Sequence, residues 1–160
     1  PRLDTVNYSG IAGTFPLSWK SYSEAKEFVF NLSNANKPEV AEFTTIVTKL
    51  KIPLSGFANK LKAGESYFWT SAIKGEENEE RKVLNMVSKE SFNALLETLK
   101  LQGEQFEAPA EQAYRLGFML EDAHYLAEAY EYYSKAATQD PTNVLYRSTL
   151  MSFKKDYELK

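Results

Sequence analysis

The chain has 160 residues, of which 43% are hydrophobic and 14% aromatic, as in a folded globular protein of one domain or two small ones. Its formal net charge is −3, with 9 Lys/Arg against 6 Asp/Glu in residues 1–75 and 10 against 16 in residues 76–160. This balance excludes the basic footprint of a nucleic-acid-binding protein, and the absence of cysteine excludes disulfides, thiolate catalysis and cysteine metal sites.

The sequence indicates no membrane span, because its longest apolar runs are a few residues and a membrane helix needs about 20. The chain begins at Pro1, without an initiator methionine or a signal peptide. We therefore expect a mature chain or an excised fragment of a longer protein.

The first half of the chain alternates apolar and polar residues with a period of two, which is typical of half-buried β-strands. Phe15, Leu17 and Trp19, for example, share one strand face. After a weak signal near residues 3–8, the predicted strands cover residues 15–19, 26–32, 40–47, 50–54 and 81–87. Pro53 indicates an edge strand or a strand end, since proline cannot donate to a β-ladder.

A second signal in this half is the pattern L-x-x-G-x-x-Y-x-W-x-x-A, formed by Leu61, Gly64, Tyr67, Trp69 and Ala72. The pattern resembles the corner between strands E and F of fibronectin type III and related immunoglobulin-like sandwiches. The resemblance implies that the tyrosine hydrogen-bonds back across the corner and that the leucine enters the core. We therefore predict an antiparallel β-sandwich over residues 1–87.

The periodicity changes at Ser88, where apolar residues begin to recur at helical spacing. The residues at i, i+3, i+4 and i+7 are Phe92, Leu95, Leu96 and Leu99. Ser88 is the expected N-cap of this helix, and Gly103 is its expected C-terminal stop. Because no Pro/Gly/Ser-rich linker separates the helix from the last strand, we expect the β part and the helical part to pack together.

Residues 110–141 carry small and apolar residues in a fixed register. They are Leu116, Gly117, Leu120, Ala129, Tyr133, Ala136 and the closing Pro141. The register resembles one tetratricopeptide repeat, a helical hairpin whose small residues let two helices approach closely, although Ala113 and Leu120 replace the family's tryptophan and tyrosine. The resemblance implies helices over residues 110–123 and 126–138.

A final helix is predicted beyond the repeat, with Thr142 or Asn143 as its cap. Its apolar stripe consists of Tyr146, Leu150, Phe153 and Tyr157. Since an isolated repeat cannot bury both of its faces, we expect this helix and the helix beginning at Ser88 to cover them. The predicted fold class is thus α+β, with a β-sandwich over residues 1–87 and a tetratricopeptide-like helical region over residues 88–160.

The repeat resemblance also indicates candidate partner-binding residues. Its groove-facing positions are occupied by Tyr114, Phe118, Glu121 and Asp122. The resemblance implies a concave peptide-binding face with an aromatic floor and an acidic edge. The competing interpretation is that the helix beginning at Ser88 fills this groove.

No catalytic residue, cofactor or metal ligand is predicted, because the chain contains no P-loop, dinucleotide fingerprint, nucleophile elbow or zinc signature. The single histidine, His124, falls in the predicted turn between the two repeat helices and has no evident orienting partner. The acidic run at residues 76–80 lacks the alternating oxygen ligands and the glycine of a calcium loop, so a solvated hairpin is favoured.

The sequence therefore predicts a non-enzymatic protein–protein interaction or scaffolding module with an unidentified protein or peptide partner. By analogy with other sandwich modules, we expect a soluble periplasmic part of a larger bacterial cell-envelope protein. Two alternatives stay open. One is a carbohydrate- or surface-polymer-binding module that uses Trp19, Tyr67 and Trp69, although a place in the core explains these residues more economically. The other is an unrecognised hydrolase.

Overall fold

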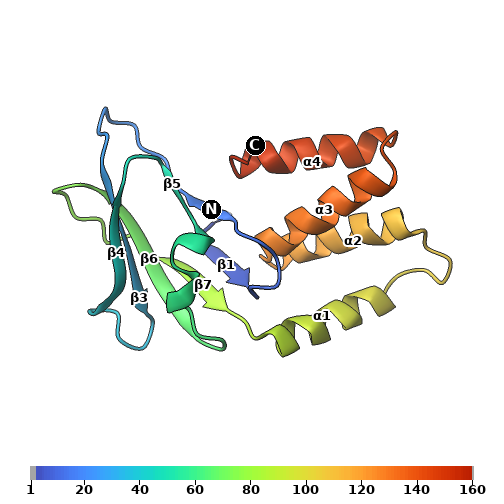
Figure 1. Ribbon diagram of the computed structural model, residues 1–160, viewed down its shortest axis with the longest axis horizontal. Coiled ribbons are helices and arrows are strands. Elements are labelled where there is room, and N and C mark those ends of the chain that lie inside the picture. Colours follow the sequence, from blue (N-terminus) through green and yellow to red (C-terminus); the bar gives the residue numbers. More distant parts are fainter. Residues whose placement is uncertain (1–2, 160) are drawn as a thin grey trace.

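The computed structural model describes residues 3–159 and has the predicted α+β fold. Within these residues, seven strands occupy the N-terminal half and four helices follow in the C-terminal part (Figure 1). Figure 1 shows an elongated body with the sheets at one end and the helices at the other. Strands β1 and β7 lie on the side of the sheet nearest the helices.

The strands form a five-stranded sheet of order β1-β7-β6-β3-β4 and a two-stranded sheet of β2 and β5. Their bounds are Thr5–Tyr8 (β1), Pro16–Ser18 (β2), Phe28–Asn34 (β3), Ala41–Val47 (β4), Lys51–Pro53 (β5), Ser66–Ile73 (β6) and Lys82–Met86 (β7). All pairs are antiparallel except β1 and β7, which run parallel with Val6 opposite Leu84. Sequence periodicity does not reveal this parallel edge, because it joins strands from opposite ends of the β part.

An aromatic core lies between the two sheets. Trp69 stacks on Phe30 with ring centroids 5.7 Å apart, and Phe30 lies 5.1 Å from Phe57. Trp19 packs against Trp69 at 6.4 Å. Trp19, Tyr67 and Trp69 are 7%, 1% and 0% exposed, which confirms that they are core residues.

Tyr67 makes the hydrogen bond that was expected across its corner. Its hydroxyl accepts from the Lys62 backbone N–H at 2.8 Å and lies 3.1 Å from Glu65 Oε2 and 3.3 Å from the Lys60 carbonyl. Leu61, between these residues, is buried in the core. The segment that leads into β6 is thereby tied to the start of that strand.

The helices are α1 (Lys89–Leu101), α2 (Pro109–Asp122), α3 (Leu126–Gln139) and α4 (Val144–Asp156). The Ser88 hydroxyl accepts from the Ser91 N–H, so the predicted N-cap of α1 is present. Asn143 caps α4 in the same way, by accepting from the Tyr146 N–H. Helix α2 starts at Pro109. Proline suits the first helical position, because an N–H there would have no intrahelical acceptor.

A glycine allows α2 and α3 to pack closely. A Cβ on Gly117 would lie 2.7 Å from Tyr133 Cδ1, so the Tyr133 ring packs directly against the α2 backbone. Tyr133 is 2% exposed, and Ala129 and Ala136 on the same helix are fully buried. The expected helical hairpin with a contact between small residues and a large ring is therefore present.

Arg115 ties the end of α1 to α2. Its Nη1 donates to the Leu99 carbonyl at 2.7 Å, and its Nε and Nη2 donate to the Glu107 carboxylate at 2.7 and 2.9 Å. These hydrogen bonds from Arg115 hold the pKa of Glu107 below its ordinary value. A Cβ at Gly103 would collide with the guanidinium, so this glycine leaves the room that the cluster needs.

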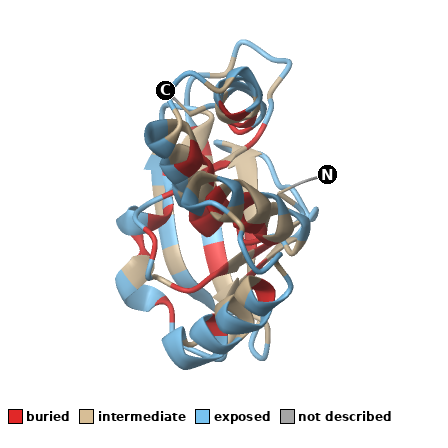
Figure 2. Cartoon of the chain, turned by 90° about the vertical axis from the view of Figure 1, so that its right-hand side faces the viewer, coloured by how far each residue is buried: buried red, intermediate tan, exposed pale blue. Residues whose placement is uncertain are grey.

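The β part and the helices share one continuous core, as expected from the lack of a linker. Ser9, directly after β1, donates through its N–H and its hydroxyl to Glu128 Oε2 on α3, at 2.9 and 2.8 Å. Phe15 packs against Tyr157 at the end of α4, with ring centroids 5.7 Å apart. Figure 2 shows the buried residues on the faces of the helices that turn toward the interior.

Candidate functional site

A cleft of about 300 Å³ lies between α2, the α2–α3 turn and the C-terminal end of α4. Its lining residues are Phe118, Glu121, Asp122, His124, Leu126 and Tyr157. Three of the four residues predicted to bind a partner therefore lie together, and the fourth, Tyr114, does not line the opening. We call this opening the α2/α4 cleft.

Phe118 and Asp122 form the exposed wall of the α2/α4 cleft. They are four residues apart on α2, so their side chains project from the same face of the helix. Phe118 is 62% exposed despite its large apolar ring. Asp122 is the last residue of α2, where the negative end of the helix dipole does not favour an acidic side chain. Neither helix stability nor core packing explains these two residue types.

The Glu121 carboxylate accepts hydrogen bonds from two tyrosines at the base of the cleft. Its Oε1 accepts from the Tyr133 hydroxyl at 2.9 Å, and its Oε2 accepts from the Tyr157 hydroxyl at 3.1 Å. Burial, together with the hydrogen bond to Glu121, raises the pKa of Tyr133, so this hydroxyl stays a donor even at alkaline pH where an ordinary tyrosine ionises. The Glu121 carboxylate thus links α2 to α3 and to the residue that follows α4.

Tyr114 lies one turn before Phe118 on α2 and packs against α4. Its ring stacks on Tyr146 with centroids 4.8 Å apart and an interplanar angle of 28°. Its hydroxyl is 3.2 Å from Thr149 Oγ1. The side chain is half-buried by this contact, which gives Tyr114 a packing role between the two helices.

Helix α1 does not fill the α2/α4 cleft. The lining of the cleft includes no residue of α1 within the described part of the chain. Instead, Phe92 of α1 packs on Tyr125, with ring centroids 5.2 Å apart, and Leu99 lies beside Arg115. Figure 1 shows α1 and α4 on opposite sides of the α2–α3 pair, so the competing interpretation of the groove does not apply to this opening.

His124 occupies the turn between α2 and α3, as predicted. Its φ of 67° is a left-handed conformation that is uncommon outside glycine. Its carbonyl accepts from the Asn7 N–H at 2.9 Å, and Asn7 Nδ2 donates to the Ala123 carbonyl at 2.9 Å. Across residues 3–159, no three His, Cys, Asp or Glu side chains are grouped so that they could hold a metal ion.

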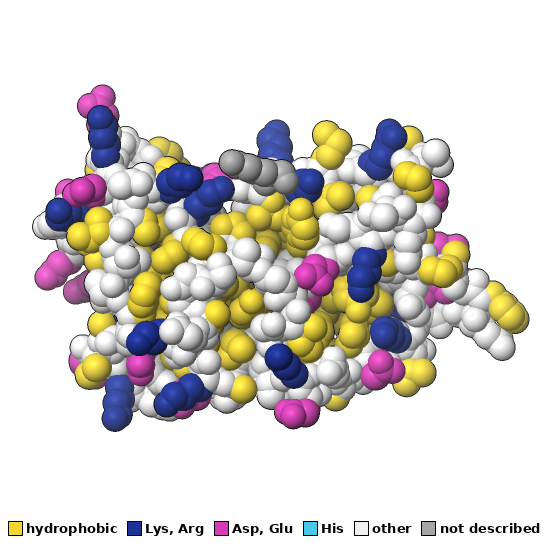
Figure 3. All heavy atoms as spheres, in the orientation of Figure 1, with side chains coloured by type: hydrophobic (Ala, Val, Ile, Leu, Met, Phe, Trp, Pro, Cys, Tyr) yellow, Lys and Arg dark blue, Asp and Glu magenta, His cyan; other side chains and the backbone are white. Residues whose placement is uncertain are grey.

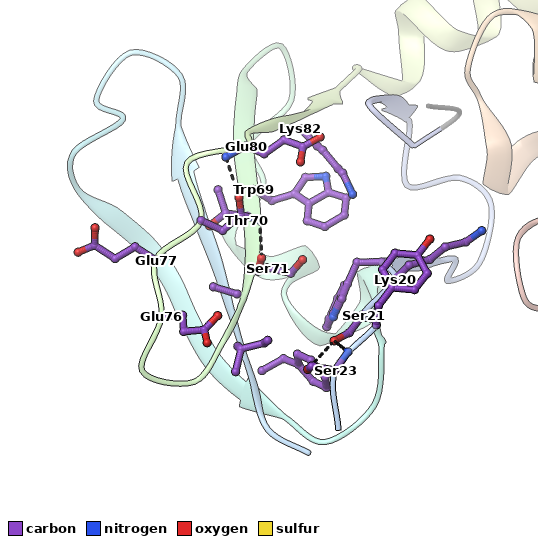
Figure 4. A pocket seen from close by; sticks show the side chains of 16 residues that line it. Lys20, Ser21, Ser23, Trp69, Thr70, Ser71, Glu76, Glu77, Glu80 and Lys82 are labelled. Carbon is purple, nitrogen blue, oxygen red and sulfur yellow. Dashed lines mark hydrogen bonds between the residues drawn. The ribbon is translucent and has the colours of Figure 1, made fainter. Parts of the chain in front are cut away.

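A second opening lies beside β6 (Figure 4). It has a volume of about 380 Å³ and is walled by residues 19–23, by residues 69–73 of β6 and by the β6–β7 loop up to Lys82. Trp19 and Trp69 both border it, and we call it the indole pocket. Since the two rings are buried, they form no exposed platform of the kind that the carbohydrate alternative assumes.

Sequence reasoning placed both tryptophans in the core and missed the pocket at their edges. A signal was present, because serines at residues 21 and 23 and glutamates at residues 76, 77 and 80 flank the predicted strands. The sequence does not show that these two loops, which are far apart along the chain, line the same pocket in the structure. The acidic loop is solvent-exposed, as predicted.

Large apolar side chains are also exposed outside the two openings, among them Leu101, Phe106, Val144 and Met151. Figure 3 shows hydrophobic side chains mainly across the middle of one face, with charged side chains mostly toward its edges. Phe106, in the α1–α2 connection, is 91% exposed and lies outside both openings. None of the helices in the described part of the chain combines the length and the apolar character needed to cross a bilayer.

No protein-family model matches the chain, and no curated protein matches it significantly in sequence.

Proposed function

We propose that the protein is an interaction or scaffolding module that binds a protein or peptide segment in the α2/α4 cleft. The observation that supports this most directly is Phe118, which is 62% exposed at the wall of a cleft of about 300 Å³. Aromatic side chains beside a concavity are frequent anchors of protein interfaces, because each buries a large apolar area at a small cost in conformational entropy.

The side chains of the cleft define the chemistry of the partner. Phe118 offers the exposed apolar surface, above Leu126 and Tyr157, which line the cleft but are almost fully buried. Asp122 adds a negative charge at the edge. A segment with an apolar side chain beside a lysine or arginine would bury the first and pair the second with Asp122. An acidic segment would meet a like charge at the same edge.

The resemblance to a tetratricopeptide repeat supports the same assignment. Phe118 and Asp122 stand at groove-facing positions of that family, and the contact of Gly117 with Tyr133 is the close helix approach that the resemblance implies. In the β part, the corner at Tyr67 supports the likeness to fibronectin-type sandwiches. By analogy with such modules, we further propose a place in the periplasm, as part of a larger bacterial cell-envelope protein.

A library of displayed random peptides tests the proposed binding. Selection on the wild-type protein should enrich peptides that carry an apolar residue next to Lys or Arg. Phe118→Ala is expected to weaken the binding of these peptides by at least about 10-fold, as for the loss of an interface anchor. Asp122→Asn should weaken the same peptides less and should reduce the salt dependence of their affinity.

Phe106→Ala is the matched control, because it removes the same ring from an exposed site outside the cleft. It should leave every peptide affinity unchanged. Peptides that bind Phe118→Ala as tightly as the wild type would show that the α2/α4 cleft is not the binding site. Equal losses for both variants would show that the peptides recognise exposed aromatic rings in general.

A further inference from the structure

The five-stranded sheet has two edges, and the helices cover the edge at β1. There the Asn7 N–H donates to the His124 carbonyl in the turn between α2 and α3, at 2.9 Å. Just beyond β1, the Ser9 N–H donates to Glu128 Oε2 at 2.9 Å. At the other edge, β4 pairs with β3 and with no other strand among residues 3–159, and Figure 1 shows it on the side of the sheet away from the helices. The edge at β4 is thus open.

The open edge leaves main-chain groups of β4 without protein partners. Alternate residues of an edge strand direct their N–H and C=O groups away from the sheet. Within residues 3–159, the backbone of Ala41–Val47 makes hydrogen bonds only in the ladder with β3. Such a row of free donors and acceptors is a template for one more strand.

β4 lacks the features that usually keep an exposed edge from pairing, such as a central lysine, a proline or a central bulge. Its one charged residue, Glu42, lies near its start, and its register with β3 shifts at the same place. Residues 43–47 read Phe-Thr-Thr-Ile-Val and contain no charge, proline or glycine. Residues of these types have a high β-propensity. This part of the edge therefore favours strand pairing.

An antiparallel pairing of β4 with β4 of a second copy matches the side chains that face the core. With Thr45 at the centre, Phe43 of each copy lies opposite Val47 of the other. Phe43 and Val47 are half-buried, and the Phe43 ring stacks on Phe57 with centroids 5.7 Å apart. An aromatic ring opposite a β-branched side chain is a favourable cross-strand pair. The pairing would thus extend the aromatic core across the interface.

The same register suits the solvent-facing side chains and the charges. Thr44 lies opposite Ile46 of the other copy, and both are exposed in the single chain. Glu42 and Lys49, the nearest charges on either side, lie opposite uncharged residues. A centre shifted by one residue in either direction would place one of these charges opposite Ile46 or Phe43. The strand is therefore complementary to itself in one register.

We propose that two copies of the protein join through β4, antiparallel and centred on Thr45, so that their five-stranded sheets become one continuous sheet across a two-fold axis. Main-chain hydrogen bonds hold the two strands together, and the side-chain pairs fix their register. This interface lies on the far side of the sheet from α2 and α4 (Figure 1). The α2/α4 cleft of each copy therefore stays open, and the pairing does not depend on what binds there.

Sedimentation equilibrium of the 160-residue chain tests the pairing. The weight-average mass should rise from the monomer value of 18.2 kDa toward twice that value as the protein is concentrated to about 1 mM, which covers dissociation constants up to the millimolar range. Over the same range, amide hydrogen exchange in residues 43–47 should slow at the N–H groups that point away from β3. A protein that stays monomeric at every concentration would overturn the proposal and leave the edge to a strand of another protein.

Ile46→Lys places a charge in the middle of the interface, and Met151→Lys is its matched control. Both residues are apolar and exposed, at 52% and 70%, and Met151 lies on α4. Ile46→Lys should weaken the dimer by about 10-fold, because the interface loses two apolar side chains and gains two like charges on one face. Met151→Lys should leave the dissociation constant unchanged. Equal effects of the two variants, or no effect of Ile46→Lys, would show that the copies meet elsewhere and would overturn the proposal.

A mixture of Thr44→Glu and Ile46→Lys tests the register. Each variant alone should dimerise about 10-fold more weakly than the wild type. Thermal melts near the wild-type value show that each variant is folded. In the mixture, the new carboxylate lies directly opposite the new ammonium group, so a mixed dimer should form with close to wild-type affinity. A mixture that associates no more tightly than either variant alone would contradict the pairing centred on Thr45.

Discussion

The indole pocket and the α2/α4 cleft differ in how their aromatic side chains are placed. At the pocket, the rings of Trp19 and Trp69 are buried in the core, and within residues 3–159 neither indole N–H has an acceptor. In the cleft, the hydroxyls of Tyr133 and Tyr157 are both paired with Glu121, while the apolar ring of Phe118 faces solvent. The ring of Phe118 is therefore accessible to a partner, whereas the core closes off the indole N–H groups from solvent.

The contrast follows from how each part builds its core. Between the sheets, the tryptophan rings fill the core, and the packing of each ring sets the position of its single N–H. Between helices, the longer reach of tyrosine lets the ring fill the interior while the hydroxyl meets a carboxylate, as Tyr133 does with Glu121. Substitutions that disturb one part and not the other would sharpen this contrast.

The largest effect is expected for Tyr133→Ala, which tests whether the two parts are independent. Tyr133 packs on Gly117 and lies 5.4 Å from the Phe153 ring, which in turn contacts Phe15 of the β part at 6.2 Å. Loss of this buried ring should lower the free energy of unfolding by about 3–5 kcal/mol. Because the core is continuous, both parts should lose that stability together.

Urea unfolding of Tyr133→Ala checks this with two probes. Both tryptophans lie in the β part, so their fluorescence follows the sheets, while circular dichroism follows the helices. The two transitions should shift to the same lower urea concentration. A fluorescence transition that stays at the wild-type midpoint would show two separately folding domains, each with its own opening.

An intermediate effect is expected at the joint between the parts, where Glu128 is 2% exposed. Glu128→Ala leaves the buried N–H and hydroxyl of Ser9 without their acceptor, which should cost about 1–3 kcal/mol in urea unfolding. Glu131→Gln is the control, because this exposed residue of the same helix accepts from the Gly13 N–H of the same loop. It should change the free energy of unfolding by less than about 0.5 kcal/mol.

The same carboxyl makes stability depend on pH. Burial raises the pKa of Glu128 above its ordinary value of 4.5, and the hydrogen bonds from Ser9 only partly offset this. The protonated form therefore favours the folded state, and this contribution is lost as the pH rises through the folded-state pKa. Since glutamine cannot ionise, the stability of Glu128→Gln relative to wild type should increase from about pH 4 to about pH 7. A constant difference would contradict the raised pKa.

Sequence reasoning worked where the physical cause is local. The Ser88 cap, the stripe of α1 that contains Phe92 and Leu99, and the small residue at Gly117 each depend on spacings of a few residues along the chain. The Tyr67 hydrogen bond is of the same kind, since the Lys62 N–H that it accepts from is five positions away. Local patterns of this sort predict elements and their caps.

Sequence patterns did not predict the contacts between distant segments of the chain. Nothing around Glu128 in the sequence indicates that Ser9, 119 positions earlier, will bury it. The parallel pairing of β1 with β7 and the two unpaired indoles also depend on packing between remote parts of the chain. For the predicted binding residues, the repeat register placed Phe118, Glu121 and Asp122 together on α2, where they line one cleft. It did not indicate that α4 covers Tyr114 and leaves Phe118 exposed.

The smallest effects are expected on that face of α2. Tyr114→Ala removes the ring that pairs with Tyr146 and Tyr133 and should lower the free energy of unfolding by about 1–2 kcal/mol. Phe118→Ala, one turn later, should change it by less than about 0.5 kcal/mol, because its ring is mostly in solvent already. Thermal melts of both variants at equal concentration measure the difference. If Phe118→Ala proved as destabilising as Tyr114→Ala, the ring would be part of the core in solution, and the α2/α4 cleft would lose the residue on which its binding role depends.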